Sequence, residues 1–410
     1  MHRTYLPTSR LFFLFLLIIQ TKSWASENVT PRSDVTSYVI VRSEDSSNSK
    51  ELNRLHPGEH LPYLGSTKGW YKVELADGTT GFVFKRWTEI HEKEDAGFAS
   101  KKFTVHFIDV GIGDAAIIDM GDKEIVIDGG NFKNDLYQYN EEHNLIDGDI
   151  ELLIVTHGDQ DHWRGLPKLL GFEDETDSPK TVGEFWEPGY NRDCNGDGSS
   201  GRASYLAFIN NVKHSVASDH FKRPLENFYT PFDVSKKLKS FFIPSLPEVK
   251  FTLLHSSSNP GEDDCSYSVN DASIVVMIEI DGIKMLFTGD ANGKERKDSA
   301  ENSPVYTEGT ILAAATGADK NLLKVDLLKA PHHGSETANT NAFIDAVDPT
   351  FVIFSASTNH HLPKDTVVER YENNYRVILR TDLNIERMRD HIICGFTDDD
   401  FNCLYAVDTK

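Results

Sequence analysis

The stretch ELLIVTHGDQDH, residues 151–162, indicates both a fold and a chemistry for this chain. Its apolar run at 152–155 is typical of a buried strand. The run ends at two histidines and two carboxylates, namely His157, Asp159, Asp161 and His162. Imidazole nitrogens and carboxylate oxygens are ligands that divalent cations accept. Because a turn after a rigid strand lets alternate side chains enter one cleft, the stretch predicts a metal site at a strand end.

Three later segments have the same form, a polar cluster directly after an apolar strand. FTGD ends at Asp290, KAPHHGS contains His332 and His333, and NHHLP contains His361. Adjacent histidines at a strand end are rarely both core residues, since neighbouring side chains of an extended chain point opposite ways. Four strand ends that each carry metal-type ligands predict a single site on one edge of a sheet structure.

The region from residue 103 to residue 380 alternates strand patterns with helical ones. Apolar strands recur throughout it, and helical patterns lie at 165–170, 203–213, 338–347 and 366–371. Strand-rich segments with helices between them predict an α+β fold, in which two sheets are sandwiched between helices.

Residues 38–90 have a different pattern, with short apolar strands separated by turn residues. Asp77-Gly78 between two such strands is a strong hairpin signal, and several strands within so short a segment predict a small barrel. The stretches GWYKV and GTTGFV, which start at Gly69 and Gly78, resemble a bacterial SH3 domain. The resemblance implies a module that binds a cell-envelope ligand; a packing or spacing domain is the alternative.

The N-terminus has the features of a secretory signal peptide. A nine-residue apolar run at 11–19 follows Arg3 and Arg10 and precedes a small-residue cleavage site near Ala25. An uncleaved N-terminal anchor is the alternative. We expect a secreted or periplasmic protein with no integral membrane segment after signal cleavage. The expected divisions are a signal peptide at 1–25, the barrel at 36–92, a linker at 93–102 and the large domain at 103–410.

Charge and cysteine content narrow the classes of function. The chain has 42 basic and 64 acidic residues, a net charge of −22, which disfavours a role in coating nucleic acid. None of its four cysteines forms a C-x-x-C pair, so a zinc ribbon is not expected. We expect a disulfide between Cys394 and Cys403 that closes a C-terminal hairpin, with Cys194–Cys265 as its complement. Four cysteines permit three pairings, and the sequence does not choose among them.

Taken in order, the histidine–aspartate motif, Thr-Gly-Asp and Pro-His-His-Gly-Ser resemble the metallo-β-lactamase superfamily. The opening FIDVGIGD at 107–114 and the triplet DGG at 128–130 are similar to the soluble metallohydrolase domain of the ComEC DNA-uptake channel. The resemblance covers about residues 103–380 and implies an αββα metallo-β-lactamase sandwich. The sequence differs from the family pattern at two positions. It has Asp159 where many members have His, and Ile112 where the ComEC-like branch often has Gln.

The resemblance also implies a ligand set for two divalent metal ions, Zn or Mn. His157 and Asp159 would bind one ion, and Asp161 and His162 the other. Asp290 would bridge the two, and either His332 or His333 would complete the second site. The ComEC-like Asn-x-x-Ser, here Asn270 to Ser273, would support these ligands; simple polarity at the start of a strand explains it equally well.

Two cations about 3.5–4 Å apart would lower the pKa of a bound water from its high bulk value towards neutrality and so supply hydroxide. Asp161 or Asp290 would hold that hydroxide. His361 would stabilise developing charge or protonate the leaving oxygen; the alternative is an exposed loop residue.

Three functions remain open. The first is a metal-dependent phosphodiesterase or nuclease-like enzyme acting on a small or short-chain phosphodiester substrate. The second is a hydrolase of carboxylic esters, lactones or thioesters. The third is a non-catalytic protein that binds the cell envelope through the SH3-like domain.

Overall fold

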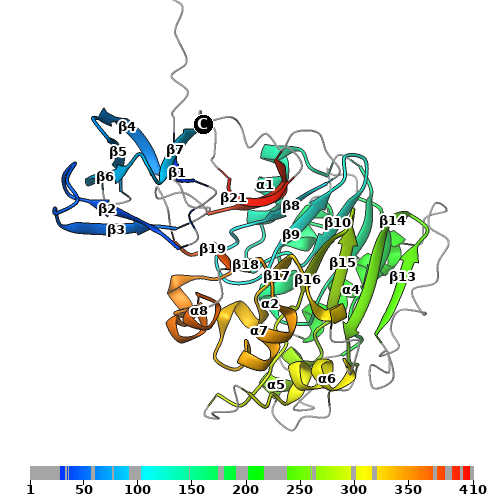
Figure 1. The fold of residues 1–410 in the computed structure, drawn as a ribbon. Helices are drawn as coiled ribbons and strands as arrows, with labels where there is room; N and C mark the ends of the chain where they lie inside the picture. Colours follow the sequence, from blue (N-terminus) through cyan, green and yellow to red (C-terminus); the bar gives the residue numbers. More distant parts are fainter. Residues whose placement is uncertain are drawn as a thin grey trace, which may run out of the picture.

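A computed structural model gives the fold (Figure 1). It describes residues 28–32, 35, 37–56, 61–75, 78–91, 103–146, 148–173, 180–190, 202–216, 238–258, 260, 265–296, 302–315, 321–372, 376–383, 390–397 and 400–406. The expected signal peptide at 1–25, the expected linker at 93–102 and Cys194 lie outside these residues.

The N-terminal strands form one antiparallel seven-stranded sheet in the order β3-β2-β6-β5-β4-β1-β7. The strands are β1 (Asn28–Pro31), β2 (Val39–Arg42), β3 (Glu51–Leu55), β4 (Leu61–Thr67), β5 (Trp70–Glu74), β6 (Thr80–Phe84) and β7 (Thr88–His91). Its small core contains Val29, Val41 and Val83. β1 lies before residue 36, where the barrel is expected from the sequence to begin. It pairs with both β4 and β7.

The larger region contains two further seven-stranded sheets. The first has the order β12-β11-β10-β9-β8-β20-β21. Its strands are β8 (Thr104–Phe107), β9 (Ala116–Asp119), β10 (Glu124–Ile127), β11 (Ile150–Ile154), β12 (Val182–Trp186), β20 (Ile392–Thr397) and β21 (Asp400–Tyr405). β10, β11 and β12 are parallel, so the carboxyl ends of these three strands lie on the same edge.

The second sheet runs from β13 to β19 in sequence order. Its strands are β13 (Lys239–Ile243), β14 (Leu246–His255), β15 (Val275–Ile280), β16 (Ile283–Phe287), β17 (Leu327–Lys329), β18 (Phe351–Phe354) and β19 (Val377–Arg380). β16 to β19 are parallel neighbours. The segments after β16 and β17 therefore leave the sheet at one edge.

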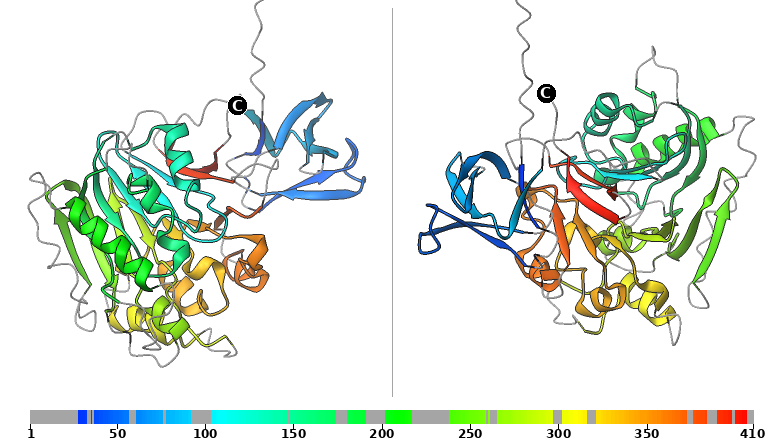
Figure 2. Two further views of the ribbon diagram at one scale, coloured as in Figure 1. Left: turned by 180° about the vertical axis from the view of Figure 1, so that it is seen from behind. Right: turned by 45° about the horizontal axis from the view of Figure 1, so that its top comes forward.

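Helices cover the outer face of each sheet (Figures 1 and 2). α1 (Asp135–His143), α2 (Gln160–Trp163), α3 (Leu166–Leu169) and α4 (Arg202–Val216) lie on the first sheet. α6 (Tyr306–Ala314), α7 (Asn341–Val347) and α8 (Asp365–Glu372) pack on the second. The short α5 (Cys265–Asp271) and the 3-10 helices η3 (Pro331–Gly334) and η4 (Thr358–His360) complete the region.

Strand alternation explains why the sandwich has three apolar layers. In β11, Leu152 and Ile154 point into the core between the sheets, whereas Leu153 faces the helices. Each sheet is therefore buried on both sides, as its nearly continuous apolar strands require. The α+β class and the αββα arrangement predicted from the sequence are confirmed.

The predicted C-terminal hairpin and its disulfide are present. β20 and β21 are antiparallel, with Cys394 directly opposite Cys403, and the two sulfurs are bonded. Among the described residues, no helix is both long and apolar enough to cross a membrane.

Candidate metal centre

The motif at 157–162 lies where the sequence predicts it, in the turn after β11 and the first residues of α2. His157 and His162 are fully buried, while Asp159 and Asp161 are partly exposed. Asp159 is the N-cap of α2, and Asp161 stands in its first turn. The strand end and the helix start thus bring both imidazoles and both carboxylates to one edge of the first sheet.

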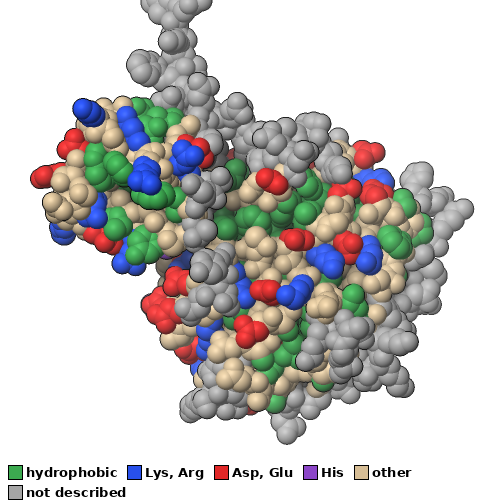
Figure 3. Space-filling model, in the orientation of Figure 1, with side chains coloured by type: hydrophobic (Ala, Val, Ile, Leu, Met, Phe, Trp, Pro, Cys, Tyr) green, Lys and Arg blue, Asp and Glu red, His purple; other side chains and the backbone are tan. Residues whose placement is uncertain are grey.

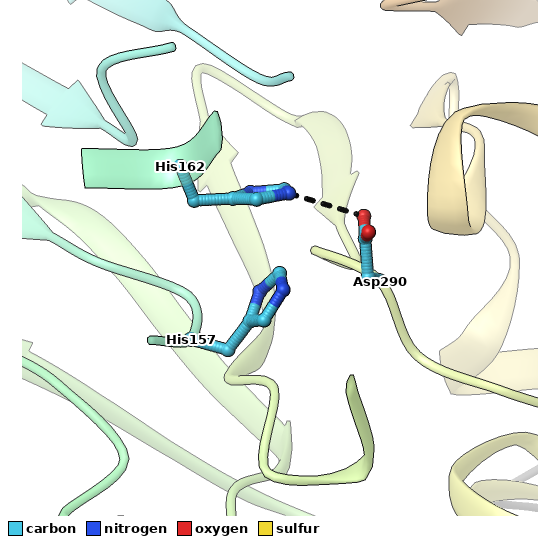
Figure 4. Close-up of side chains that lie close together, drawn as sticks. All are labelled: His157, His162 and Asp290. Carbon is cyan, nitrogen blue, oxygen red and sulfur yellow. Dashed lines mark ion pairs between the residues drawn. The ribbon is translucent and has the colours of Figure 1, made fainter. Parts of the chain in front are cut away.

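Asp128, at the end of β10, orients His162. Its carboxylate accepts hydrogen bonds from the Nδ1 of His162 (2.8 Å) and from the backbone N and Oγ1 of Thr156 (both 2.7 Å). A carboxylate that holds one ring nitrogen of a histidine fixes the ring and leaves the other nitrogen for a metal. The Nε2 of His162 points to Asp290, 3.4 Å from its Oδ1 (Figure 4).

Asp290 and His333 reach the same place from the second sheet. Asp290 follows β16, and its backbone N donates to the Oγ of Ser273 (3.2 Å), as the predicted supporting role of Ser273 requires. His333 donates from Nδ1 to the carbonyl oxygen of Ser355 (2.8 Å). Its Nε2 therefore faces inward, 3.3 Å from Asp290 Oδ2 and 3.4 Å from Asp161 Oδ2.

His332 lies beside this cluster but is held differently. Its Nδ1 lies 3.0 Å from the Oγ1 of Thr337, and its Nε2 is 3.7 Å from Asp290 Oδ2. Burial lowers the pKa of His332 to about 4, although Asp290 opposes the effect. The two histidines occupy a turn with positive φ (48° and 52°), not an extended segment. The sequence left the choice between them open, and the geometry favours His333 as the ligand.

The donor atoms fit a bound cation. The Nε2 atoms of His157, His162 and His333 and the Oδ1 of Asp290 are buried and have no hydrogen-bond partner. Such unsatisfied groups are rare in protein interiors. Ligand atoms of His157, His162 and Asp290 all lie within 4.8 Å of one another, as do those of Asp161, His162 and His333. Asp159 is 3.6 Å from His157 Nε2. The structure thus brings together every predicted ligand.

The electrostatics of the cluster favour positive charge at its centre. Burial alone would lower the pKa of His162, but Asp290 and Asp128 outweigh it and raise that pKa well above its usual value. Burial would likewise raise the pKa of Asp290, yet His333 and His162 hold it well below the usual range. A divalent cation would displace the protons from these imidazoles, because a metal binds the neutral ring.

Sequence reasoning missed two buried side chains at this site, Asp114 and Lys329. The ammonium of Lys329 lies against Asp114 Oδ2, 3.9 Å from Asp290 Oδ1, and donates to the carbonyl oxygen of Gly289 (3.1 Å). Asp114 Oδ1 is also 3.2 Å from His333 Nδ1. The preceding Gly113 has φ +113°, and a Cβ there would meet the carbonyl oxygen of Asp161 at 2.0 Å. Gly113 in FIDVGIGD is thus the sequence feature that indicates how closely this loop approaches the backbone of Asp161.

His361 lies on an exposed turn, two residues before the segment that packs on Gly334. It follows η4 with φ 55°, so residues 360 and 361 lie in a turn and not in an extended segment. Pro363 packs on Gly334, and Lys364 N donates to Gly334 O (3.0 Å), which fixes this loop against the turn that carries His333. The structure gives no contact between the His361 side chain and the described ligands, and its catalytic role stays a prediction.

Residues 37–89 match the bacterial SH3 domain family. The barrel is similar to bacterial SH3 domains. A second match, to ComE operon protein 3 of Bacillus subtilis strain 168, is 28% identical over 139 residues and covers 33% of this chain. It covers only 16% of that protein. Both resemblances predicted from the motifs are therefore confirmed.

Solved structures that are similar to this chain include several metallo-β-lactamase-fold proteins. YhfI of Bacillus subtilis has a TM-score of 0.39 and 10% identity, covering 69% of this chain and 97% of its own. The short form of human tRNase Z has a TM-score of 0.37 and 14% identity, and the match covers 63% of this chain and 94% of that protein. Zn-bound PqqB from Methylobacterium extorquens has a TM-score of 0.36 and 13% identity, and the match covers 66% of this chain and 86% of that protein. These scores are low, so the fold assignment rests on the sheet topology above.

Proposed function

We propose that this protein is a dinuclear, divalent-metal-dependent hydrolase, and that its substrate is a small or short-chain phosphodiester. The observation that carries the proposal is the convergence of buried, unpartnered donor atoms from both sheets, described above for His157, His162, His333 and Asp290. The match to ComE operon protein 3 supports the same assignment. Zinc and manganese both suit this mixed nitrogen and oxygen donor set.

The ligands divide into two groups with Asp290 between them. His157 and Asp159 would hold one cation, and Asp161, His162 and His333 the other. Asp290 would bridge the pair, because it offers a ligand atom within 4.8 Å of those of His157 and His162, and its Oδ2 lies 3.3 Å from His333 Nε2. Bound there, two cations would polarise a phosphoryl oxygen and make a bound water acidic enough to ionise near neutral pH.

The protein's own side chains would position the reactants and move the protons. Asp161 lies 3.4 Å from His333 Nε2 and is partly exposed, so its carboxylate can meet an incoming substrate at the edge of the cluster. His361 is exposed in the loop whose Lys364 N donates to the carbonyl oxygen of Gly334, the residue after His333. We assign to it protonation of the leaving oxygen, one of the two roles predicted from the sequence.

Hydrolysis of bis-p-nitrophenyl phosphate by the purified protein tests the proposal. We expect activity that is lost with a chelator and restored by Zn²⁺ or Mn²⁺, and that is lost in Asp290→Asn. Asp345→Asn is the matched control, because Asp345 is exposed on α7. Cleavage of carboxylic esters, lactones or thioesters without any cleavage of phosphodiesters would instead support the second function. Full activity in Asp290→Asn would contradict the proposed site.

We further propose that the barrel holds a secreted or periplasmic enzyme against a cell-wall polymer. Hydrophobic and cationic side chains lie together on the barrel (Figure 3). Arg86 lies over the ring of Trp87, 4.9 Å from its centroid. Trp87 is 42% exposed and Phe84 is 37% exposed. Sedimentation of the full chain with purified cell walls should decrease in Trp87→Ala. Equal sedimentation of the variant and the wild type would contradict this role.

A further inference from the structure

Glu308, on α6, is a buried carboxylate that the proposed chemistry does not use. Its side chain has no exposed surface and accepts three hydrogen bonds from the segment after the histidine turn. The donors are Asn339 N to Oε1 (2.6 Å), Thr340 N to Oε2 (3.1 Å) and Thr340 Oγ1 to Oε2 (2.6 Å). A buried carboxylate is costly unless it is hydrogen-bonded in this way. Such a group in an otherwise apolar helix interface calls for a specific role.

Asn339 connects Glu308 to the turn that carries His333. Its side-chain Nδ2 donates to Pro331 O (2.9 Å) and to Ser335 O (3.3 Å), the carbonyls on either side of that turn. Its Oδ1 accepts a hydrogen bond from the hydroxyl of Tyr371 (2.8 Å). The amide of Asn339 therefore brackets the histidine turn, and Glu308 holds the backbone from which that amide extends.

The turn needs such support because its backbone is unfavourable. His332 and His333 both have positive φ, and Asn339 has φ 60°. The left-handed region is unfavourable for a non-glycine residue, and such residues persist where surrounding contacts determine them. His333 depends on this conformation to direct Nε2 at Asp161 and Asp290 while Nδ1 bonds Ser355.

Glu308 also contacts the segment that carries Asp290. Its backbone N donates to Asn292 O (3.0 Å), two residues beyond Asp290. Gly293 follows, and a Cβ there would lie 2.1 Å from Glu308 Oε2, so the main chain passes directly over the carboxylate. One residue thus touches the segments that supply both ligands of the second sheet.

We propose that Glu308 is a positioning residue for the metal centre, acting through Asn339 on the turn that sets His333 Nε2 opposite Asp290. The proposal rests on the proposed function in that it takes His333 and Asp290 as ligands. A residue that served only general stability would affect unfolding without a selective effect on metal affinity. Residues that orient metal ligands typically alter metal affinity or activity by about 10–100-fold when changed.

The test is a titration of the full chain with Zn²⁺, and in parallel with Mn²⁺, in wild type, Glu308→Gln and Glu336→Gln. Glutamine has nearly the shape of glutamate but only one acceptor oxygen, so its NH2 group must face either Asn339 N or the two donors of Thr340, which it cannot accept from. Glu336 lies in the same segment, and its carboxylate instead accepts from Thr366 Oγ1 (2.9 Å) at the surface. We expect affinity to fall about 10–100-fold for Glu308→Gln and to stay at the wild-type value for Glu336→Gln.

A second variant keeps the test decisive if Glu308→Gln does not fold. Asn339→Gly removes the bracketing amide, yet glycine accepts the positive φ, so it should also lower metal affinity. In both variants the metal-free protein should lose the slowly exchanging Nδ1 proton of His333 in NMR spectra. Wild-type affinity in Glu308→Gln and Asn339→Gly would overturn the proposal. A wild-type chain that binds metal but cleaves no phosphodiester would overturn the proposed function alone, because affinity still measures positioning.

Discussion

The ammonium group of Lys329 lies against the Oδ2 carboxylate oxygen of Asp114, and both side chains are buried at the metal centre. Lys329 stands two positions before Pro331, and Asp114 comes from the loop between β8 and β9. The pair therefore joins the two sheets beneath the ligands. The charge of Lys329 also balances one of the negative charges of the carboxylates around the buried ligand atoms.

Removal of one partner of this pair should be strongly destabilising. Lys329→Met leaves the Asp114 carboxylate buried without its cation, and breaking a buried pair in this way costs about 3–5 kcal/mol. Denaturant unfolding in the presence of a chelator measures the loss. Lys324→Met is the control, since Lys324 pairs with Asp348 at the surface (2.9 Å), where such pairs contribute about 0–1 kcal/mol. The double variant Asp114→Asn/Lys329→Met should recover part of the loss; similar small losses for Lys329→Met and Lys324→Met would contradict this account.

Substitutions at Asp161 and His361 should separate a ligand from a proton donor. Asp161→Ala is expected to lose both metal and activity. His361→Ala should keep its metal content and lose about 10²–10⁴ in rate. His360→Ala is the control in the same loop, because its side chain is also exposed and the proposed proton transfer does not use it, so its rate should stay near the wild-type value. Elemental analysis and phosphodiester turnover measure the two effects. Equal losses of rate at 360 and 361, or metal depletion in His361→Ala, would assign this loop a different role.

Acid should destabilise the fold through His106, which lies far from the ligands in the sequence. Burial, with a contribution from His143, lowers the pKa of His106 to about 3, and its Nδ1 lies 2.8 Å from the hydroxyl of Tyr139. The folded state therefore binds fewer protons than the unfolded state between about pH 6.5 and pH 3, so stability falls as pH falls through this window.

This single group contributes a slope of up to about 1.4 kcal/mol per pH unit. His106→Gln should flatten the dependence of the free energy of unfolding on pH, whereas His56→Gln, at an exposed position of the barrel, should not. Denaturant unfolding at a series of pH values measures both. An unchanged slope in His106→Gln would show that the histidine is protonated in the folded state.

Metal loading should raise the stability of the protein. A ligand that binds only the folded state at 100 times its dissociation constant contributes about 2.7 kcal/mol. We expect a higher Tm with Zn²⁺ or Mn²⁺ than with a chelator, and no difference in Asp290→Asn. A Tm that is the same with and without metal in the wild-type protein would argue against a site formed by the folded chain.

The parts of the site that could be predicted from the sequence are those whose chemistry is local. The motif HGDQDH directly follows an apolar run, so the sequence itself shows that these residues stand at the end of a strand. The same pattern, polar residues after an apolar strand, recurs at Asp290 and His333. Parallel strands β10, β11, β16 and β17 then bring those ends together. The roles of Asp128 and Lys329 could not be read in this way, because their partners, His162 and Asp114, are set by packing between strands and not by neighbours in the sequence.

Other failures have local causes. A pair of adjacent histidines suggests alternate sides of an extended chain, but His332, His333 and His361 adopt left-handed conformations that the residue types alone do not require. Helix α6 was not predicted, since its sequence YTEGTILAA has a central glycine and little separation of apolar and polar faces. Glu308, which that helix contributes, was accordingly missed with it.

The ligands come from both halves of the sandwich, and this has a consequence for how the protein assembles. His157 and His162 belong to the first sheet, whereas Asp290 and His333 belong to the second, far along the chain. A chain emerging from synthesis can offer a cation only the first group until the second sheet has packed. Tight metal binding should therefore come late in folding. The cation would then link two sheets that are synthesised at different times.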